Sequence, residues 1–191
     1  MQRSGETLVK NGQVIGLHRS VFDFIKKVID ERWDSSYARV LELGSKEDYP
    51  DGYSGPRVKA AFPEGINYTG IDITDGLGVD MIMNANDLQY DDGSFDVVVS
   101  SEMLEHDHHP HKSMSEAIRV LRKGGLLIVA AAAPNMNPHY VEGSNVHTPG
   151  PRECYCNISK DLLTVWMKGL VPQKIWYERD NKDVFAWGVK R

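Results

Sequence analysis

The fold of this chain is decided by the stretch Val40-Leu41-Glu42-Leu43-Gly44-Ser45, together with Tyr68-Thr69-Gly70-Ile71-Asp72-Ile73. Each stretch has the pattern of a buried strand, and each ends beside a carboxylate. Glycine at a strand end lets a ligand approach the backbone closely, and an Asp at the next strand end can accept from both hydroxyls of a ribose. Because consecutive parallel strands end at the same edge of an open sheet, the two stretches predict a crevice for a nucleoside-containing ligand.

The composition indicates one globular domain. Of the 191 residues, 41% are hydrophobic and 9% aromatic, which suffices for one sizeable core but not for two. We therefore expect a single domain over residues 1–191, with residues 1–38 as a helical N-terminal extension. The net charge of -5 argues against a nucleic-acid partner, because binding to a phosphate backbone relies on concentrated Lys and Arg.

Neither a membrane segment nor a structural metal site is expected. The longest apolar stretch, Leu126–Ala133, is far shorter than the roughly 20 residues that span a bilayer, and the N-terminus lacks a signal-peptide pattern. We expect a soluble, cytoplasmic protein without a membrane partner. Cys154 and Cys156 form a lone C-x-C, which supplies half of a structural zinc site at most, so free thiols are expected.

The first half of the chain alternates helix and strand. Ser20 is a candidate helix cap, and five apolar side chains then recur at helical spacing: Val21, Ile25, Val28, Ile29 and Trp33. Strands are predicted at Arg39–Leu43, Asn67–Ile73 and Val79–Met83, with a short helical turn at Arg57–Phe62. Residues 74–78 are too few for a crossover helix, so the third strand is either parallel with an abbreviated connection or short and irregular.

The second half has clearer signals. Strands are predicted at Asp96–Ser100, Leu126–Ala131, Val171–Tyr177 and Val184–Val189, of which the last two form a hairpin. One helix begins at Pro110 and closes at Arg122–Gly125 with basic residues and a glycine cap. A second helix begins at Ser159 and is expected to bury Leu162, Leu163 and Trp166. The alternation predicts an α/β fold.

Five motifs, in order along residues 40–189, carry a resemblance to a known family: VLELGS, YTGIDI, GVDMIMNANDL, DGSFDVVVSSEMLEH and RVLRKGGLLIV. With these motifs the chain resembles the class I S-adenosylmethionine-dependent methyltransferases, and among them the small members that modify glycans or metabolites. The resemblance implies a Rossmann-like three-layer sandwich whose seven-stranded sheet is mostly parallel with an antiparallel last strand. The predicted hairpin agrees with that arrangement.

The resemblance also implies how S-adenosylmethionine is held, with S-adenosylhomocysteine as the product. Glu42 and Gly44 would lie at the methionine moiety, and Asp72 would bind the ribose. Asn84 stands where the family commonly has an Asp facing the adenine amine, and the Ala85 N–H would pair with the adenine ring. The expected cofactor-binding residues are Glu42, Gly44, Ser45, Asp72, Ile73, Asn84, Ala85, Ser101 and Glu102.

Each of these assignments has a purely structural alternative. Glu42 could cap the following loop, whereas Asp72 and Asn84 could accept main-chain N–H groups in turns. A nicotinamide enzyme is disfavoured because Gly44 is followed by Ser45-Lys46-Glu47-Asp48, without the later glycines of a dinucleotide-binding loop. Many methyltransferases also have a second glycine here, so the wrapping of the methionine tail stays open.

Catalytic candidates come from two segments. His106 and His147 could each remove a proton from a hydroxyl acceptor, although a structural role is equally open for both. The histidines at residues 106–111 lack further ligands at metal-binding spacing, so no metal is expected. Residues 133–158 are predicted to form a loop on the substrate side, whose candidate contacts are His139, Tyr140, His147, Arg152 and Tyr155.

The sequence thus predicts methyl transfer from S-adenosylmethionine to a small-molecule acceptor, and the resemblance alone suggests a sugar or glycan-precursor hydroxyl. Two other classes stay open. One is a non-catalytic module that binds S-adenosylmethionine, and the other is a Rossmann oxidoreductase of the NAD type. The sequence does not indicate an oligomeric state.

Overall fold

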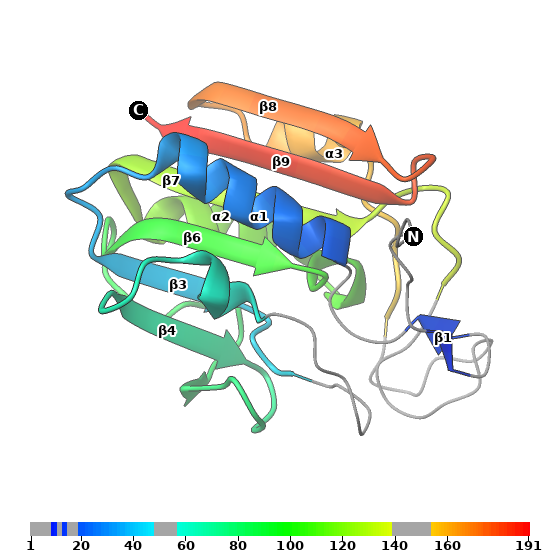
Figure 1. The fold of residues 1–191 in the computed structure, drawn as a ribbon, viewed down its shortest axis with the longest axis horizontal. Helices are drawn as coiled ribbons and strands as arrows, with labels where there is room; N and C mark the ends of the chain where they lie inside the picture. The colour runs from blue at the N-terminus through cyan, green and yellow to red at the C-terminus, as the bar shows by residue number, and fades with distance from the viewer. Residues whose placement is uncertain (1–8, 11–12, 15–18, 48–56, 139–153) are drawn as a thin grey trace, which may run out of the picture.

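A seven-stranded sheet is the centre of the molecule in the computed structural model (Figure 1). The described residues are 9–10, 13–14, 19–47, 57–138 and 154–191. The strands in spatial order are β5 (Met81–Ile82), β4 (Asn67–Asp72), β3 (Arg39–Leu43), β6 (Phe95–Ser101), β7 (Leu121–Ala132), β9 (Asp183–Lys190) and β8 (Leu170–Glu178). This order confirms the predicted α/β sandwich.

The strand directions also agree with the prediction. Strands β5, β4, β3, β6 and β7 pair in parallel, whereas β9 pairs antiparallel with both β7 and β8. Strand β6 is central and buried along its whole length, as expected for its run Val97-Val98-Val99. All parallel strands therefore end at one edge of the sheet, where open α/β sheets bind their ligands.

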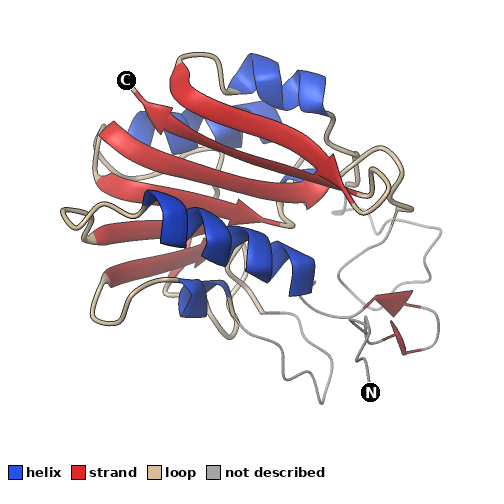
Figure 2. Ribbon diagram, turned by 45° about the horizontal axis from the view of Figure 1, so that its top comes forward, coloured by secondary structure: helices blue, strands red, loops and turns tan. Residues whose placement is uncertain are grey.

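Helices cover both faces of the sheet (Figure 2). On one face, α1 (Arg19–Arg32) and the short helix η1 (Val58–Ala61) pack on the sheet and share a buried apolar cluster with it. On the other face, α2 (Pro110–Val120) and α3 (Lys160–Trp166) share a second cluster. The apolar stripe that predicted α1 is the reason it packs there, since Val21, Ile25, Val28 and Ile29 are all buried.

Two anchors fix the ends of elements. Asp96 at the start of β6 accepts main-chain N–H bonds from Ala38 and Arg39 at 3.0 and 2.8 Å and also pairs with Arg122. Lys190 at the end of β9 donates its ammonium to the carbonyls of Ile118 and Leu121, both at 2.6 Å. The lysine thereby satisfies carbonyls that the end of α2 leaves open.

Several boundaries differ from the prediction. Helix α1 begins at Arg19, so Ser20 lies inside it rather than capping it. Helix α2 ends at Val120 because Leu121 already pairs with Phe95, and residues 122–125 form an irregularity in β7 instead of a helix cap. Strand β5 has two residues and is parallel, so both alternatives for the third strand hold in part.

Two further observations concern packing and the N-terminal stretch. Leu162 was expected to be buried but is 41% exposed, because α3 turns only Leu163 fully inward. Within residues 1–38, two short antiparallel strands, β1 (Val9–Lys10) and β2 (Gln13–Val14), precede α1. Among the described residues, no helix combines the length and apolar character needed to cross a membrane.

Candidate functional site

The carboxyl ends of β3 and β4 meet the turn that follows β6. Gly44 has a positive φ of 73°, and a Cβ at this position would lie 2.4 Å from Cγ of Met103. The N–H groups of Gly44 and Ser45 both donate to the carbonyl of Ile71 at 2.9 Å. Only glycine fits this close approach of the Met103 side chain, and the role of Gly44 towards a ligand stays a prediction.

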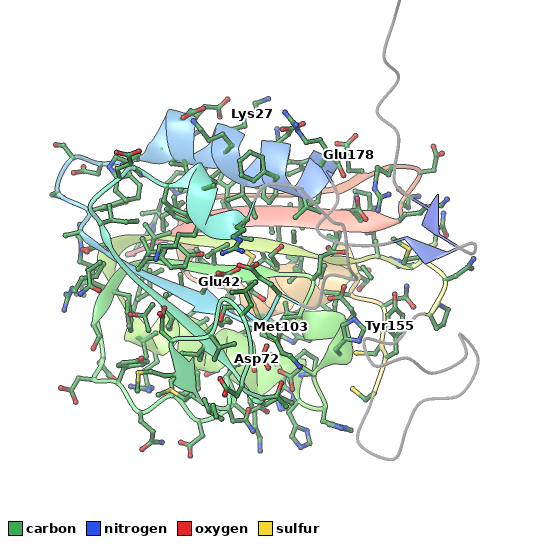
Figure 3. All side chains as sticks on the ribbon, turned by 60° about the horizontal axis from the view of Figure 1, so that its bottom comes forward. Lys27, Glu42, Asp72, Met103, Tyr155 and Glu178 are labelled. Atoms are coloured by element: carbon green, nitrogen blue, oxygen red, sulfur yellow. The ribbon has the colours of Figure 1, made fainter. Side chains whose placement is uncertain are left out.

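Glu42 is a buried carboxyl group at this edge. Its Oε2 accepts a hydrogen bond of 2.7 Å from the Tyr68 hydroxyl. Burial raises the pKa of Glu42 to about 7, the Tyr68 bond acts in the opposite direction, and the nearby carboxylates Glu47, Asp80 and Asp72 raise it further. The group can therefore change its charge near neutral pH when a cation approaches. Figure 3 labels it near Met103 and Asp72.

Asp72 has the turn contacts that its structural alternative predicts. Its Oδ1 accepts from the N–H and hydroxyl of Thr74 at 3.0 and 3.2 Å, and its Oδ2 accepts from the N–H of Lys46 at 3.4 Å. The same carboxylate lies at the carboxyl end of β4, beside Gly44 in the next strand. Ile73, directly after it, is 69% exposed, which is a large apolar surface for a ligand to cover.

The adenine-side candidates lie in the turn after β5. The Asn84 side-chain oxygen accepts from the Asn86 N–H at 2.9 Å, which is the turn contact of its structural alternative. Asn84 is exposed and Ala85 is buried. The structure therefore brings Asn84 and Ala85 to the β5 side of the same edge, next to the end of β4.

A group of buried carboxyl groups lies after β6, and sequence reasoning found only one member, Glu102. Glu105 is 0% exposed, and its Oε1 accepts from the Ala132 N–H at 3.1 Å. Burial raises the pKa of Glu102 well above its ordinary value and that of Glu105 to about 7, with Asp183 contributing to both. The sequence held one sign of Glu105 as a buried carboxyl group, which is that it directly follows the apolar residue Leu104.

His106 and Tyr155 lie at the same edge. The centroids of the two rings are 5.3 Å apart in an edge-to-face arrangement. The main-chain N–H of His106 donates to the Met103 carbonyl at 3.0 Å. The expected second base, His147, lies outside the described residues, as do His139, Tyr140 and Arg152. Among the residues that are described, no group of three or more His, Cys, Asp or Glu is placed to hold a metal ion.

The described ends of the predicted substrate-side loop are attached to this edge. The Cys156 N–H donates to the Glu105 carbonyl and the Ile158 N–H to the Ala132 carbonyl, both at 2.8 Å. Cys154 and Cys156 are free thiols. Residues 154–158 therefore border the turn that carries Glu102 and Glu105.

Several buried polar atoms at this edge have no hydrogen-bond partner within the described part of the chain. They are the hydroxyl oxygens of Ser45, Ser100 and Ser101, Oε1 of Glu102 and Oε2 of Glu105. Buried polar atoms are nearly always paired with protein, water or ligand, so a concentration of unpaired ones at strand ends fits a binding site. They fit a polar ligand at the carboxyl ends of β3 and β6.

Comparison with known proteins agrees with this geometry. Residues 53–129 match the family described as a methyltransferase domain. A Thermotoga maritima S-adenosylmethionine-dependent methyltransferase, described as a possible histamine N-methyltransferase, superposes with a TM-score of 0.59 at 18% identity, over 91% of each chain.

Two other solved structures are similar. A protein bound to the Haloferax volcanii Trm112 methyltransferase activator has a TM-score of 0.58 at 18% identity, over 89% of this chain and 90% of that one. The Burkholderia thailandensis 1,6-didemethyltoxoflavin-N1-methyltransferase, with S-adenosylhomocysteine bound, has a TM-score of 0.59 at 13% identity, over 90% and 79%. At these identities the likeness concerns the fold.

Residues 53–129 thus match a methyltransferase domain, and the strand order is that of a fold shared with S-adenosylmethionine-dependent methyltransferases of known structure. The expectation of a methyltransferase is thereby confirmed.

Proposed function

We propose that the chain transfers a methyl group from S-adenosylmethionine to a hydroxyl group of a small molecule, with sugars and glycan precursors as the first acceptors to test. The observation that carries the proposal is the set of polar atoms on Ser101, Glu102 and Glu105, at and directly after the end of β6, that have no partner among the described residues. Such atoms suit an acceptor rich in hydrogen-bonding groups.

The residues at the strand ends would each contact a different part of the cofactor. Glu42, Gly44 and Ser45 would hold the methionine end, where the Glu42 carboxylate attracts the amino group. Asp72 would accept from the ribose hydroxyls while Ile73 covers the base, and Asn84 and Ala85 would contact the adenine edge. When bound, the cofactor supplies a methyl group on a cationic sulfur, which is displaced in line and needs chiefly alignment from the protein.

Binding and transfer are tested separately. Calorimetric titration should show that S-adenosylmethionine and S-adenosylhomocysteine bind and that NAD does not. Transfer is then followed with radiolabelled S-adenosylmethionine on a panel of sugars, sugar nucleotides, phenols and carboxylates. Binding without transfer to any member of the panel would favour a non-catalytic binding module, whereas binding of NAD alone would refute the assignment.

Replacing Asp72 tests the ribose role against the turn role. Asp72→Ala should weaken S-adenosylhomocysteine binding by roughly 1.5 to 3 kcal/mol, because a charged acceptor is lost. Thr74→Val is the matched control, since it removes only the Thr74 hydroxyl bond to Asp72. Unchanged affinity in Asp72→Ala, together with a lower melting temperature in both variants, would leave Asp72 as a turn residue.

A further inference from the structure

Three carboxyl groups and one guanidinium converge beyond the end of β6, on the side away from β3. Glu102 follows β6 directly, Glu105 lies in the short helix η2 (Leu104–His106), and Asp183 begins β9. Arg179, in the turn between β8 and β9, donates through Nε and Nη2 to the two oxygens of Asp183. The group therefore joins three segments at the carboxyl edge of the sheet.

The pairing inside this group is incomplete. Asp183 is matched by Arg179, and Glu105 uses Oε1 for the Ala132 N–H. Oε1 of Glu102 and Oε2 of Glu105 are buried and have no partner among the residues that the structure describes. Independently, the Ser101 hydroxyl beside them has no partner although its residue is only 8% exposed. These atoms leave unmet hydrogen-bonding capacity where a polar ligand would reach them.

The backbone places Glu102 between the two halves of the crevice. Its N–H continues the sheet by donating to the Ala130 carbonyl at 2.9 Å, and its φ of 54° turns the chain so that Met103 lies against Gly44. Met103 therefore lies on the cofactor side, while the Glu102 side chain interacts with Glu105, Asp183 and Arg179 on the β7 and β9 side. Tyr155, labelled in Figure 3, borders this side next to His106.

We propose that Glu102 is the catalytic residue that accepts the proton of a hydroxyl acceptor, and that Glu105 is a positioning residue which holds the Glu102 carboxyl in this role. The inference deepens the proposed function and rests on it. The acceptor oxygen forms a bond to the methyl carbon, the carbon–sulfur bond breaks with its electron pair on sulfur, and the hydroxyl proton passes to Glu102 Oε1. The proton then leaves to solvent.

The electrostatics suit this task. Burial, Glu105 and Asp183 raise the pKa of Glu102, whereas Arg179 lowers it. Burial and Asp183 raise the pKa of Glu105 to about 7. Cys156 lies close to Glu105, and the pKa of its thiol is raised by burial and by Glu105. A carboxylate with a raised pKa is a stronger base than an exposed one, and a second carboxyl group nearby makes it harder to ionise. A neutral amine acceptor would attack without losing its proton first, so this arrangement favours hydroxyl acceptors.

The proposal has a defined dependence on pH. Glu102 accepts a proton only when ionised, so kcat rises as the pH rises through its pKa. Glu105→Gln keeps an oxygen for the Ala132 N–H but removes a negative charge that raises the Glu102 pKa. The rising limb of the rate profile should therefore move to lower pH in Glu105→Gln.

The experiment measures kcat and KM against pH for the best hydroxyl acceptor of the panel, in wild type, Glu102→Gln, Glu105→Gln and the exposed control Glu64→Gln. We expect Glu102→Gln to lose about 100-fold or more in kcat, as for a general base, with S-adenosylhomocysteine affinity by calorimetry within twofold of wild type. Glu64→Gln should match wild type in rate and pH profile.

A second readout does not need turnover. In protein labelled with carbon-13 at the glutamate carboxyls and saturated with S-adenosylhomocysteine, the resonance missing from Glu102→Gln identifies Glu102. Its titration midpoint should lie well above the ordinary value of a glutamate carboxyl and should fall in Glu105→Gln. An ordinary midpoint, or one that Glu105→Gln leaves in place, would overturn the proposed pairing.

The kinetic outcomes separate the two proposals. If wild type transfers methyl to hydroxyls and Glu102→Gln keeps its kcat and rising limb, the inference fails while the proposed function stands. A rising limb that disappears in His106→Ala and persists in Glu102→Gln would assign the base to the histidine and also overturn it. If wild type binds the cofactor and methylates nothing, the proposed function itself fails.

Discussion

At the scale of single residues, Glu42 illustrates how burial makes a carboxyl group titrate near neutral pH. Its only hydrogen bond given by the structure is the one from Tyr68, whose own pKa is raised well above its ordinary value by burial and by Glu42. Tyr68 therefore stays protonated and continues to donate when Glu42 ionises. The pair leaves Glu42 able to respond to a cationic ligand while its geometry stays fixed.

The raised pKa of Glu42 predicts a dependence of stability on pH. The folded carboxyl keeps its proton up to about pH 7, while the unfolded one loses it near 4.5, so the free energy of unfolding falls as the pH rises between these values. Glu42→Gln removes this fall in the free energy of unfolding, because glutamine does not ionise, and it keeps an oxygen acceptor for the Tyr68 hydroxyl. Its stability relative to wild type should rise by about 3 kcal/mol between pH 4.5 and pH 8, taking about 1.4 kcal/mol per pKa unit.

Urea unfolding without ligand at the two pH values measures this difference. Glu64→Gln serves as the control, because Glu64 is exposed and the substitution makes the same change in charge. A relative stability of Glu42→Gln that stays constant with pH would show that Glu42 ionises at its ordinary pKa.

At the scale of elements, Asp96 fixes the starts of two strands and the irregular part of a third. Its carboxylate accepts from two consecutive N–H groups at the start of β3 and from Arg122 in β7. Asp96→Ala leaves those donors without their acceptor and should lower the free energy of unfolding by about 3 kcal/mol. Asp96→Asn, which keeps one oxygen acceptor, should lose less.

Denaturant midpoints compare the two Asp96 variants. Asp92→Ala is a suitable control, because Asp92 also pairs with an arginine but its side chain is 80% exposed. Exposed ion pairs contribute little, so Asp92→Ala should change stability by less than about 1 kcal/mol. Equal losses in Asp92→Ala and Asp96→Ala would contradict the anchoring role.

The same elements show which parts of the fold were predictable. Buried strands such as β6 and amphipathic helices such as α1 have local patterns, and both were predicted. The end of α2 was not, because the pairing of Leu121 with Phe95 outweighs the glycine signal at Gly124-Gly125. Strand β5 was predicted too long. It forms only two residue pairs with β4, and the second pair, at Ile82, is with the last residue of β4.

The candidate site divides in the same way. Glu42, Gly44 and Asp72 were predicted as candidates because they lie in or next to the carboxyl ends of β3 and β4, where the pattern along the chain marks them. Asp183 and Arg179 meet Glu102 and Glu105 only through the order of strands in the sheet, and Arg179 and Asp183 were assigned to an ordinary hairpin turn. The spacing of residues along the sequence does not predict a contact between segments about eighty residues apart.

At the scale of the whole molecule, the cofactor should act as a stabilising ligand. S-adenosylhomocysteine at 100 times its dissociation constant should raise the free energy of unfolding by about 2.7 kcal/mol, because it binds only the folded chain. NAD at the same concentration should leave the melting temperature unchanged. Thermal unfolding with each ligand measures both, and stabilisation by NAD alone would contradict the site as described.

The position of β9 has a consequence for the order in which the molecule is assembled. Strand β8 pairs only with β9, yet it is synthesised first, so it leaves the ribosome before the strand that holds it in the sheet. All expected cofactor-binding residues have been made by then. A nascent chain stopped before residue 183 thus contains every residue predicted to bind the cofactor, but it still lacks the Asp183 carboxylate that pairs with Arg179.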